Sequence, residues 1–495
     1  MSQRGPLTAS AQGAKISSVH LATSVLQTVV PRLAPILAEA GMKPIVLFFH
    51  PRTFHEKNYR YFYIPYSLLS VASVIDRNRY DLAILDNNVE RIDDWTERLQ
   101  QMQVPLAVGI SSMIGAQISD GLAFASAART AFPAVPIVWG GALPTVLPEL
   151  TVDHPLVDYA IAGQGQSAFP DLLDALTDGM KGQLTVPGVY GGGRVPAARR
   201  ATFKPWEGYP AFRDCYDLVD VERYIQYDEH INDRTVNYHS SQGCPFGCGF
   251  CSEVALWERK WTGVTAGRIL ADIEHLIAHH GVTGIKFYDA EFFISRKRVF
   301  EFAQAVVDRD LGIRWAAAVH PRNFDRLSDD EVSLLARSGA SRLLMGAESA
   351  VQAELDLVNK KTDREMLLRN AKRCADSGIV GSFSFVTGYP RSPSAHIEES
   401  LRFAADLLHA GPDHEAKVHF YAPYPGTALY DLAVECGFRA PATLEQWSEY
   451  DYYYITTPWI DDKWEPIVRE FNEGAYPYLH ADTESPQERL CPIIA

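Results

Sequence analysis

Between residues 43 and 180, short runs of apolar residues alternate with stretches that have the periodicity of a helix. Residues 66–76 and 117–131 repeat apolar side chains at helical spacing. Each apolar run ends in small or polar residues, and this alternation predicts an α/β fold with an open parallel sheet of the doubly wound, Rossmann-like type. The runs expected to be strands are 44–49, 82–85, 105–110, 135–139 and 159–162.

The ends of these runs hold the first candidate binding residues. Ligands of doubly wound sheets bind outside the carboxyl ends of the strands. We expect a ligand at a serine pair and two glycine-rich turns that follow the third, fourth and fifth runs. The alternative is that the glycines only permit tight turns. The candidates are Ser111, Ser112, Gly140, Gly141, Gly163, Gln164 and Gly165.

A second alternation of strands and helices runs from about residue 236 to residue 438. It contains six β/α units in fewer residues than the roughly 250 of a closed eightfold barrel. We therefore expect an open, partial (β/α)6 barrel with its site at the carboxyl ends of the strands. The expected strands are 236–239, 284–288, 313–319, 342–345, 381–387 and 417–421, and the expected helices are 266–280, 299–309, 329–338, 364–377 and 396–408.

The remaining segments lack this regularity. An aromatic-rich end with Trp447, Tyr450, Tyr452, Tyr453, Tyr454 and Trp459 is interpreted as a packed cap or a substrate wall. The predicted organisation is an N-terminal extension (1–42), a front domain (43–180), a linker (181–232), the barrel (233–438) and a C-terminal cap (439–495).

Composition and charge narrow the class of protein. The 495 residues include 46 Lys and Arg against 61 Asp and Glu, a formal charge of −15, which disfavours a nucleic-acid-binding surface. Apolar residues at 47% and charged residues at 22% are typical of a packed globular chain. We find neither an apolar run of about 18 residues nor a signal peptide, so we expect a cytoplasmic protein without a transmembrane segment.

Three of the seven cysteines, Cys244, Cys248 and Cys251, lie close together with the spacing Cys-x3-Cys-x2-Cys. Three thiolates in a glycine-bearing loop can hold three irons of an iron–sulfur cube and leave the fourth iron open. One alternative is a zinc site with His239 as the fourth ligand, although the paired knuckle spacing is absent. Chance clustering of structural cysteines is another. We interpret the scattered Cys215, Cys374, Cys436 and Cys491 as buried small side chains.

With this cysteine motif at the start of a partial barrel, the sequence resembles the radical S-adenosylmethionine (SAM) enzymes. The resemblance implies a [4Fe–4S] cluster whose open iron binds SAM. It also implies reductive cleavage of SAM to a 5′-deoxyadenosyl radical, which abstracts hydrogen from an unactivated carbon. An external electron donor, such as a reductase, a flavodoxin or a ferredoxin, would be the partner. Phe250, before the last cysteine, matches the family's adenine-contacting position.

Residues after later strands match further SAM-contacting segments of this family. Asp289 and Glu291 follow the second strand, where a carboxylate would pair with the SAM amino group. Arg322 follows the third strand and would meet the SAM carboxylate. Glu348 and Ser349, after the fourth strand, match the segment that contacts ribose and methionine, and Gly388 ends the fifth strand.

The front domain resembles the cobalamin-binding domain of cobalamin-dependent radical SAM enzymes, such as hopanoid methylases, the anaerobic magnesium-protoporphyrin ester cyclase and antibiotic-pathway methylases. The resemblance implies that the serine and glycine candidates above bind cobalamin. The sequence departs from the pattern, however. The Asp-x-His-x-x-Gly motif is absent, Leu143 stands where relatives often have His, and Gln164 and Gln166 replace glutamates.

This resemblance predicts cobalamin-dependent C-methylation of a small-molecule or lipid substrate in specialised biosynthesis. Because of the departures, two cobalamin-independent reactions stay open: dehydration of an aminoglycoside-type sugar diol, and radical cyclisation or rearrangement. The non-enzyme alternative is an iron–sulfur electron carrier, which would need none of the SAM-contacting residues.

Overall fold

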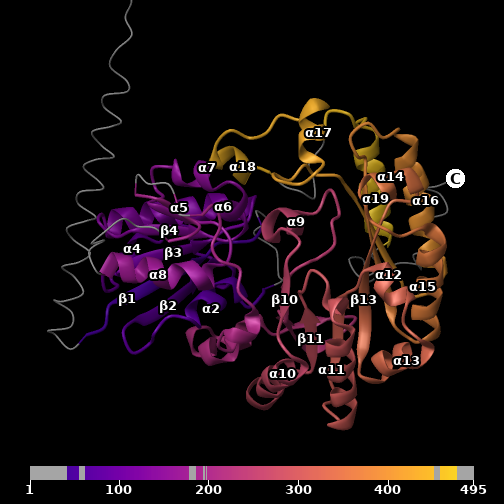
Figure 1. The fold of residues 1–495 in the computed structure, drawn as a ribbon, viewed down its shortest axis with the longest axis horizontal. Helices are drawn as coiled ribbons and strands as arrows, with labels where there is room; N and C mark the ends of the chain where they lie inside the picture. The colour runs from indigo at the N-terminus through magenta and orange to yellow at the C-terminus, as the bar shows by residue number, and fades with distance from the viewer. Residues whose placement is uncertain are drawn as a thin grey trace, which may run out of the picture. The chain divides into compact units, whose positions relative to one another are not determined.

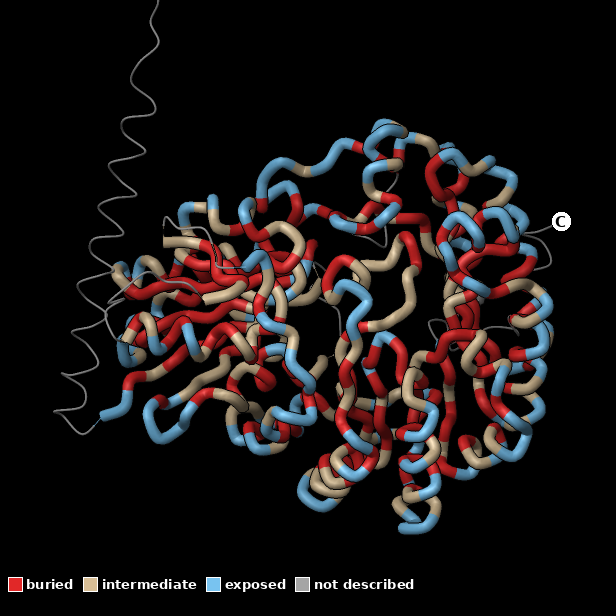
Figure 2. Tube along the Cα trace, in the orientation of Figure 1, coloured by how far each residue is buried: buried red, intermediate tan, exposed pale blue. Residues whose placement is uncertain are grey.

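The computed structural model describes residues 42–54, 62–177, 186–192, 196, 198–450 and 457–475. The extension 1–41, Tyr452, Tyr453, Tyr454 and Cys491 lie outside the described residues. The chain divides into two compact units, one comprising residues 1–55 and 67–203, the other residues 56–66 and 204–495. Each unit is built around its own sheet, and most sheet residues are buried (Figures 1 and 2).

The first unit has a six-stranded sheet with the order β2-β1-β3-β4-β5-β6, in which all neighbours are parallel except β5 and β6. Its strands are β1 (Ile45–His50), β2 (Asp81–Asp86), β3 (Ala107–Ser111), β4 (Ile137–Gly140), β5 (Tyr159–Ile161) and β6 (Val189–Gly191). Its helices are α2 (Tyr66–Ala72), α3 (Asn87–Glu90), α4 (Thr96–Gln100), α5 (Ala116–Ala131), α6 (Ala142–Val146), α7 (Pro148–Val152) and α8 (Gly165–Thr177). The strand order reverses between β1 and β3, the point at which doubly wound sheets bind ligands.

Strand β1 shows why both faces of this sheet are covered. Successive side chains of a strand point to opposite faces. Phe49 stacks on Phe124 of α5 with ring centroids 3.7 Å apart, and Phe48 packs against Phe169 of α8 at 5.3 Å. Gly109 in the neighbouring strand leaves room for Phe48, because a Cβ there would lie 2.7 Å from its ring. The apolar run is therefore buried by a helix on each face, as the doubly wound prediction requires.

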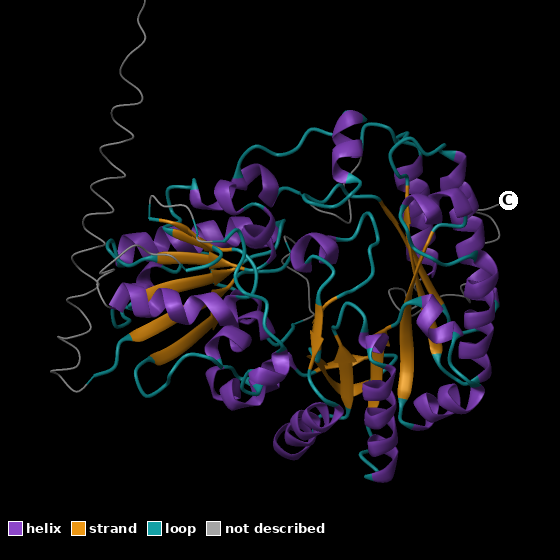
Figure 3. Cartoon of the chain, in the orientation of Figure 1, coloured by secondary structure: helices purple, strands orange, loops and turns teal. Residues whose placement is uncertain are grey.

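The second unit has a curled, seven-stranded sheet with the order β15-β14-β13-β12-β11-β8-β7 (Figure 3). Six strands are parallel: β8 (Asn232–Tyr238), β11 (Gly284–Phe287), β12 (Arg314–Ala318), β13 (Ala340–Glu348), β14 (Val380–Thr387) and β15 (Glu415–Phe420). Strand β7 (Gln226–Asp228) runs antiparallel to β8, and β9 (Ser241–Gly243) pairs separately with β10 (Trp261–Gly263). Six parallel β/α units confirm the predicted partial barrel.

The helices between these strands follow the predicted ranges closely, and α10 (Ala266–His280) coincides with the prediction. The others are α9 (Ser252–Trp257), α11 (Arg296–Asp308), α12 (Pro321–Asp325), α13 (Asp329–Arg337), α14 (Gln352–Leu357), α15 (Arg364–Asp376), α16 (Ala395–His409), α17 (Tyr430–Glu435), α18 (Leu444–Ser448) and α19 (Trp464–Ala475). Short 3₁₀ turns are η1 (Trp206–Gly208), η2 (Phe212–Leu218), η3 (Val221–Tyr224) and η4 (Phe292–Ile294). Local signals set the ends of α10: the side chain of Thr265 caps its first turn, and Gly281 ends it at φ 58°.

The described part of the C-terminal segment packs on the barrel unit. Asn472 of α19 accepts a hydrogen bond from Val418 N and donates one to Val418 O, both at 2.8 Å. Its amide thereby takes the place of a neighbouring strand at the edge of β15. Trp459 Nε1 donates to Gly388 O at 2.9 Å. Within the described residues, no helix has the length and apolarity needed to span a membrane.

Candidate cluster loop and cofactor-binding edges

The three clustered cysteines lie in the loop that connects β9 to α9, beyond the carboxyl end of β8. Cys244, Cys248 and Cys251 are free thiols. The loop begins with Gly243 at φ 82°, where a Cβ would lie 2.2 Å from the carbonyl oxygen of Lys260. Only glycine fits this close approach of two backbone segments. The glycine thus starts the turn that presents the cysteines.

Residues from distant parts of the barrel hold this loop in place. Gly249 N donates to Val358 O at 2.9 Å, and Gly249 O accepts from Leu429 N at 3.0 Å. Asn359 Nδ2 donates to Gly247 O at 3.1 Å. The segments after β13 and β15 therefore clamp the loop from two sides, and its backbone is set by long-range contacts.

The electrostatics of the three thiols fit a metal cluster. Burial, together with the negative charges of neighbouring groups that include the other cysteines, raises the pKa of Cys244 and of Cys251 to about 12. Thiols that influence one another in this way lie close together. Without a bound cation they stay protonated near neutral pH, whereas a coordinated iron would hold them as thiolates. The loop can therefore supply three thiolates to one cluster.

A buried ion pair lies beside the cysteines. Lys360 Nζ is 2.6 Å from Glu348 Oε1, and the two side chains are 9% and 6% exposed. Glu348 ends β13 with a positive φ of 63°. The nearby carboxylate of Glu348 and the negative charges of Cys248 and Cys251 raise the pKa of Lys360 against the opposing effect of burial. Sequence reasoning found Glu348 but missed Lys360, because a lysine in the loop after a short helix has no local signal.

Asp289 has an internal structural role. Its carboxylate accepts hydrogen bonds from Ser240 N at 2.7 Å, from the Ser240 hydroxyl at 2.5 Å and from the Ser241 hydroxyl at 2.6 Å. Arg298 Nη2 lies 3.4 Å away, and the side chain of Asp289 is fully buried. These partners engage both carboxylate oxygens, so the carboxylate ties the ends of β8 and β11 together.

Glu291 is likewise buried and connects neighbouring strand ends. It accepts hydrogen bonds from Phe293 N at 3.1 Å, from Asn323 Nδ2 at 3.2 Å and from the backbone N–H of His320. Burial raises its pKa to about 7. Burial and the positive charge of Lys360 lower the pKa of His320 to about 3, so its ring is neutral where it stacks on Phe246 of the cysteine loop at 4.3 Å.

The other SAM candidates differ in their surroundings. Phe250 lies 6.2 Å from the ring of Tyr389, and the charges of Glu348 and Cys248 help raise the pKa of Tyr389. Phe250, Glu348 and the cysteines therefore share one region.

Ser349 is buried and donates to Glu354 at 2.5 Å. Arg322 is half-buried in α12 near His320. A Cβ at Gly388 would lie 2.6 Å from Ile460, so the C-terminal segment covers this glycine.

In the first unit, the serine and glycine candidates gather at the carboxyl edge of the sheet. Ser111 pairs in register with Gly140, and Ser112 N donates to Gly140 O at 2.9 Å. A Cβ at Gly140 would meet nothing within 4 Å, and Gly141 is exposed with φ 101°. This open backbone, with the half-buried Ser111, can accept the broad face of a ligand.

The remaining candidates at this edge are supporting residues. Ser112 and Gln164 are buried, and Ser112 O accepts from Leu143 N at 3.0 Å. A Cβ at Gly165 would lie 2.8 Å from Val71, so this glycine allows close helix packing. The structure therefore separates an open strip from the buried residues that shape it.

Comparisons with known proteins identify two domains in this chain. Residues 57–173 match the B12 binding domain, and residues 238–404 match the radical SAM superfamily. This chain is a radical SAM protein with a B12-binding domain. Its radical SAM domain implies a [4Fe–4S] cluster and SAM, and its B12-binding domain implies cobalamin. The predicted family and cofactors are confirmed. The radical SAM domain identifies the chain as an enzyme, so the alternative of an iron–sulfur electron carrier is wrong.

Several relatives are similar over most of this radical SAM protein. An uncharacterized methyltransferase of Pyrococcus horikoshii is 26% identical over 75% of this chain and 78% of its own length. The anaerobic magnesium-protoporphyrin IX monomethyl ester cyclase of Rubrivivax gelatinosus is 28% identical over 67% of this chain, but only 58% of its own length is covered. The hopanoid C-3 methylase of Methylococcus capsulatus is 27% identical over 59% of this chain and 54% of its own length.

Solved structures show the same fold. The radical SAM methyltransferase TsrM from Kitasatospora setae, with cobalamin and a [4Fe–4S] cluster bound, has a TM-score of 0.64. It is 18% identical and covers 80% of this chain and 78% of its own. The cobalamin-dependent SAM radical enzyme OxsB has a TM-score of 0.60 at 16% identity, over 80% of this chain and 56% of its own.

Proposed function

We infer that this protein is a cobalamin-dependent radical SAM methyltransferase that methylates an unactivated carbon of a small molecule or lipid. The observation that carries the proposal is the loop of three free thiols, held at the carboxyl end of the barrel beside the Glu348–Lys360 pair. The open strip at Ser111, Gly140 and Gly141 in the B12-binding domain supports the cobalamin requirement. Methyltransferases among the relatives support the reaction type.

The bound cofactors would supply the one-electron cleavage of SAM, the abstraction of hydrogen from the substrate, and the methyl group, which cobalamin would carry. The chain would supply their positions. Cys244, Cys248 and Cys251 would each hold one iron, which leaves the fourth iron for SAM. Glu348 and Lys360 present both signs of charge next to Cys248, as the ammonium and carboxylate of an amino acid require.

Residues around the loop would keep this region dry. Phe246 stacks on the neutral ring of His320, and Phe250 lies near the buried Tyr389. Aromatic and neutral groups around a charged centre exclude water and strengthen the electrostatic interactions within it.

A radical SAM enzyme needs an external electron donor, and we propose a flavodoxin, a ferredoxin or a reductase. The free cysteines among the described residues fit a reducing compartment such as the cytoplasm. The acidic charge disfavours nucleic acid as the substrate.

The first experiment tests SAM cleavage. Anaerobically reconstituted protein is incubated with SAM and dithionite, and 5′-deoxyadenosine is measured by mass spectrometry. The wild type and the control C436A should form it, because Cys436 lies outside the loop. The triple variant C244A/C248A/C251A should form none. Equal formation by the triple variant would refute the cluster assignment.

The second experiment tests cobalamin binding. The wild type is reconstituted with hydroxocobalamin, and the bound corrinoid is measured by its absorbance after desalting. Gly140→Leu projects a side chain from a position where an added Cβ meets nothing within 4 Å, and it should abolish binding. The matched control is Gly267→Leu, at an exposed glycine of α10 that also has open space. A wild type that binds no corrinoid would favour cobalamin-independent dehydration or cyclisation.

A further inference from the structure

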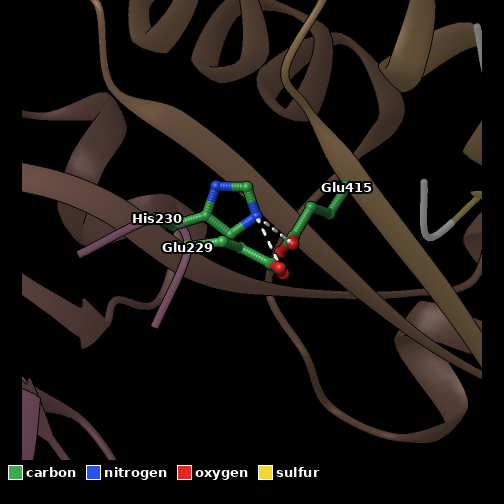
Figure 4. Close-up of side chains that lie close together, drawn as sticks. All are labelled: Glu229, His230 and Glu415. Atoms are coloured by element: carbon green, nitrogen blue, oxygen red, sulfur yellow. Dashed lines mark ion pairs between the residues drawn. The ribbon is translucent and has the colours of Figure 1, made fainter. Parts of the chain in front are cut away.

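A second group of potential metal ligands lies at the opposite ends of the barrel strands from the cysteine loop. Glu229 and His230 form the turn between β7 and β8, and Glu415 is the first residue of β15 (Figure 4). Strands β7 and β15 are the two outer strands of the seven-stranded sheet. The group therefore joins the two edges of the open barrel at its base.

The donor atoms converge on one small volume. His230 Nε2 lies 2.6 Å from Glu415 Oε1 and 3.9 Å from Glu229 Oε1, and the potential ligand atoms of the group all lie within 4.8 Å of one another (Figure 4). Zinc binds nitrogen and carboxylate oxygen at about 2.0–2.2 Å, so two ligands of one tetrahedral ion lie about 3.3–3.5 Å apart. The observed separations bracket that value, so small side-chain shifts would complete a site.

The carboxylate of Glu415 is buried with its oxygens available to an ion. Glu415 is 1% exposed, and neither of its carboxylate oxygens accepts a hydrogen bond of good geometry within the described residues. Arg342 Nη1 lies 3.6 Å from Glu415 and balances one carboxylate, and Lys286 balances Asp228 at 3.3 Å. Lys417 also interacts with the Glu415 carboxylate, so basic side chains balance the carboxylates here, and an ion would be held by the converging donor atoms.

A single proton cannot satisfy this geometry as well as a metal ion can. A proton on His230 Nε2 bridges to one carboxylate at a time, whereas a metal ion binds all three groups at once. One nitrogen and two carboxylates form a donor set for zinc or a similar first-row ion, since magnesium and calcium prefer oxygen alone. Arg342, whose guanidinium lies 3.6 Å from Glu415, would orient this carboxylate toward the ion.

We propose that Glu229, His230 and Glu415 bind a divalent transition-metal ion that clips the two edges of the partial barrel together at its base. Glu229 is exposed, so the ion can enter from solvent and keep water as its remaining ligand. The ion would stabilise the barrel by joining segments that are far apart in the chain. This site is independent of the proposed methyl transfer.

The test uses ZnCl2 and the full-length C244A/C248A/C251A protein, in which the cluster cysteines cannot bind zinc. After desalting, metal analysis should find one zinc per chain, and zinc should raise the melting temperature. In this background, His230→Gln and Glu415→Gln should weaken zinc binding at least about tenfold. The control is His409→Gln, because the exposed His409 hydrogen-bonds the backbone oxygen of Ala405 at 2.7 Å and should leave zinc binding unchanged.

A variant at the exposed ligand keeps the test decisive even if the buried variants fail to fold. Glu229→Gln should leave the metal-free melting temperature unchanged and remove most of the rise that zinc causes. The proposal is overturned if the parent protein binds no zinc, or if Glu229→Gln binds zinc as tightly as the parent. Either result would leave the close contact between His230 and Glu415 as an ion pair that needs no metal ion.

Discussion

The ion pair between Lys360 and Glu348 allows a quantitative test of the candidate site. Lys360→Met keeps most of the apolar stem but removes the ammonium group, and it leaves the Glu348 carboxylate buried without its partner at 2.6 Å. The groups around the ion pair are closely packed. A Cβ at Gly346 would lie 2.1 Å from the Glu348 carboxylate and 2.5 Å from the lysine nitrogen, so the backbone already presses against the pair.

The expected loss of stability follows from this burial. Removing one partner of a buried ion pair costs about 3–5 kcal/mol, because the remaining charge is desolvated and uncompensated. Removing both charges in Lys360→Met/Glu348→Met eliminates the stranded carboxylate. The double variant should therefore be more stable than Lys360→Met by at least about 2 kcal/mol.

Urea unfolding of the cluster-free protein, followed by circular dichroism, measures these differences. Lys297→Met is the control, because Lys297 is 84% exposed and pairs with Glu301 at 3.7 Å. That variant should unfold like the wild type. The reasoning fails if Lys360→Met is as stable as the control, or if the double variant loses the sum of the losses of the two single variants.

The pH dependence of this ion pair has a defined sign. The pKa of Lys360 is raised above its usual 10.5, mainly by Glu348 among the groups that oppose the effect of burial. A raised lysine pKa contributes stability that is present below about 10.5 and is lost as the pH rises through the higher folded value. The contribution of Lys360 to the stability of the wild type should therefore be present in full from pH 7 to pH 9 and should fall only at higher pH.

Three further predictions concern single side chains. The pKa of His320 is lowered to about 3, so the unfolded chain takes up the proton first and stability falls by up to about 1.4 kcal/mol per pH unit below pH 6.5. His320→Phe should remove that part of the slope in urea titrations at pH 4.5–6.5. Asn472→Leu breaks both hydrogen bonds to Val418 and leaves its backbone groups unpaired, which should cost about 1–3 kcal/mol in urea unfolding; an unchanged midpoint would contradict the edge-capping role. Gly109→Ala places a Cβ 2.7 Å from Phe48, and this overpacking should reduce the free energy of unfolding by about 1–3 kcal/mol. The melting temperature of the B12-binding unit should therefore fall, whereas Gly267→Ala at an exposed position of α10 should not lower the melting temperature.

The regular elements were largely predictable because their signals are local. The periodicity of α10 and its flanking Thr265 and Gly281 defined a helix that the structure reproduces at both ends. Strand β6 had no such signal. It has three residues, and only its antiparallel pairing with β5 makes it a strand.

The site was predictable in part. The spacing of Cys244, Cys248 and Cys251 is a property of one short loop, so the sequence alone was enough to propose them as cluster ligands. The state of each carboxylate depends on partners far away in the chain. Asp289 is engaged by Ser240, Ser241 and Arg298, whereas Glu348 faces Lys360. The motif order could not separate these two environments.

By itself, the sequence determined two α/β units, the order of their strands along the chain, and a three-cysteine motif with the chemistry of an iron–sulfur enzyme. Only the tertiary structure decided which backbone stays open at Gly140, that Lys360 lies beside the cysteines, and that His230 meets Glu415 across the base of the barrel. The physical reason is how far apart along the chain the interacting residues lie. Periodicity and spacing report contacts within a few residues, whereas burial and charge pairing are set when distant segments pack together.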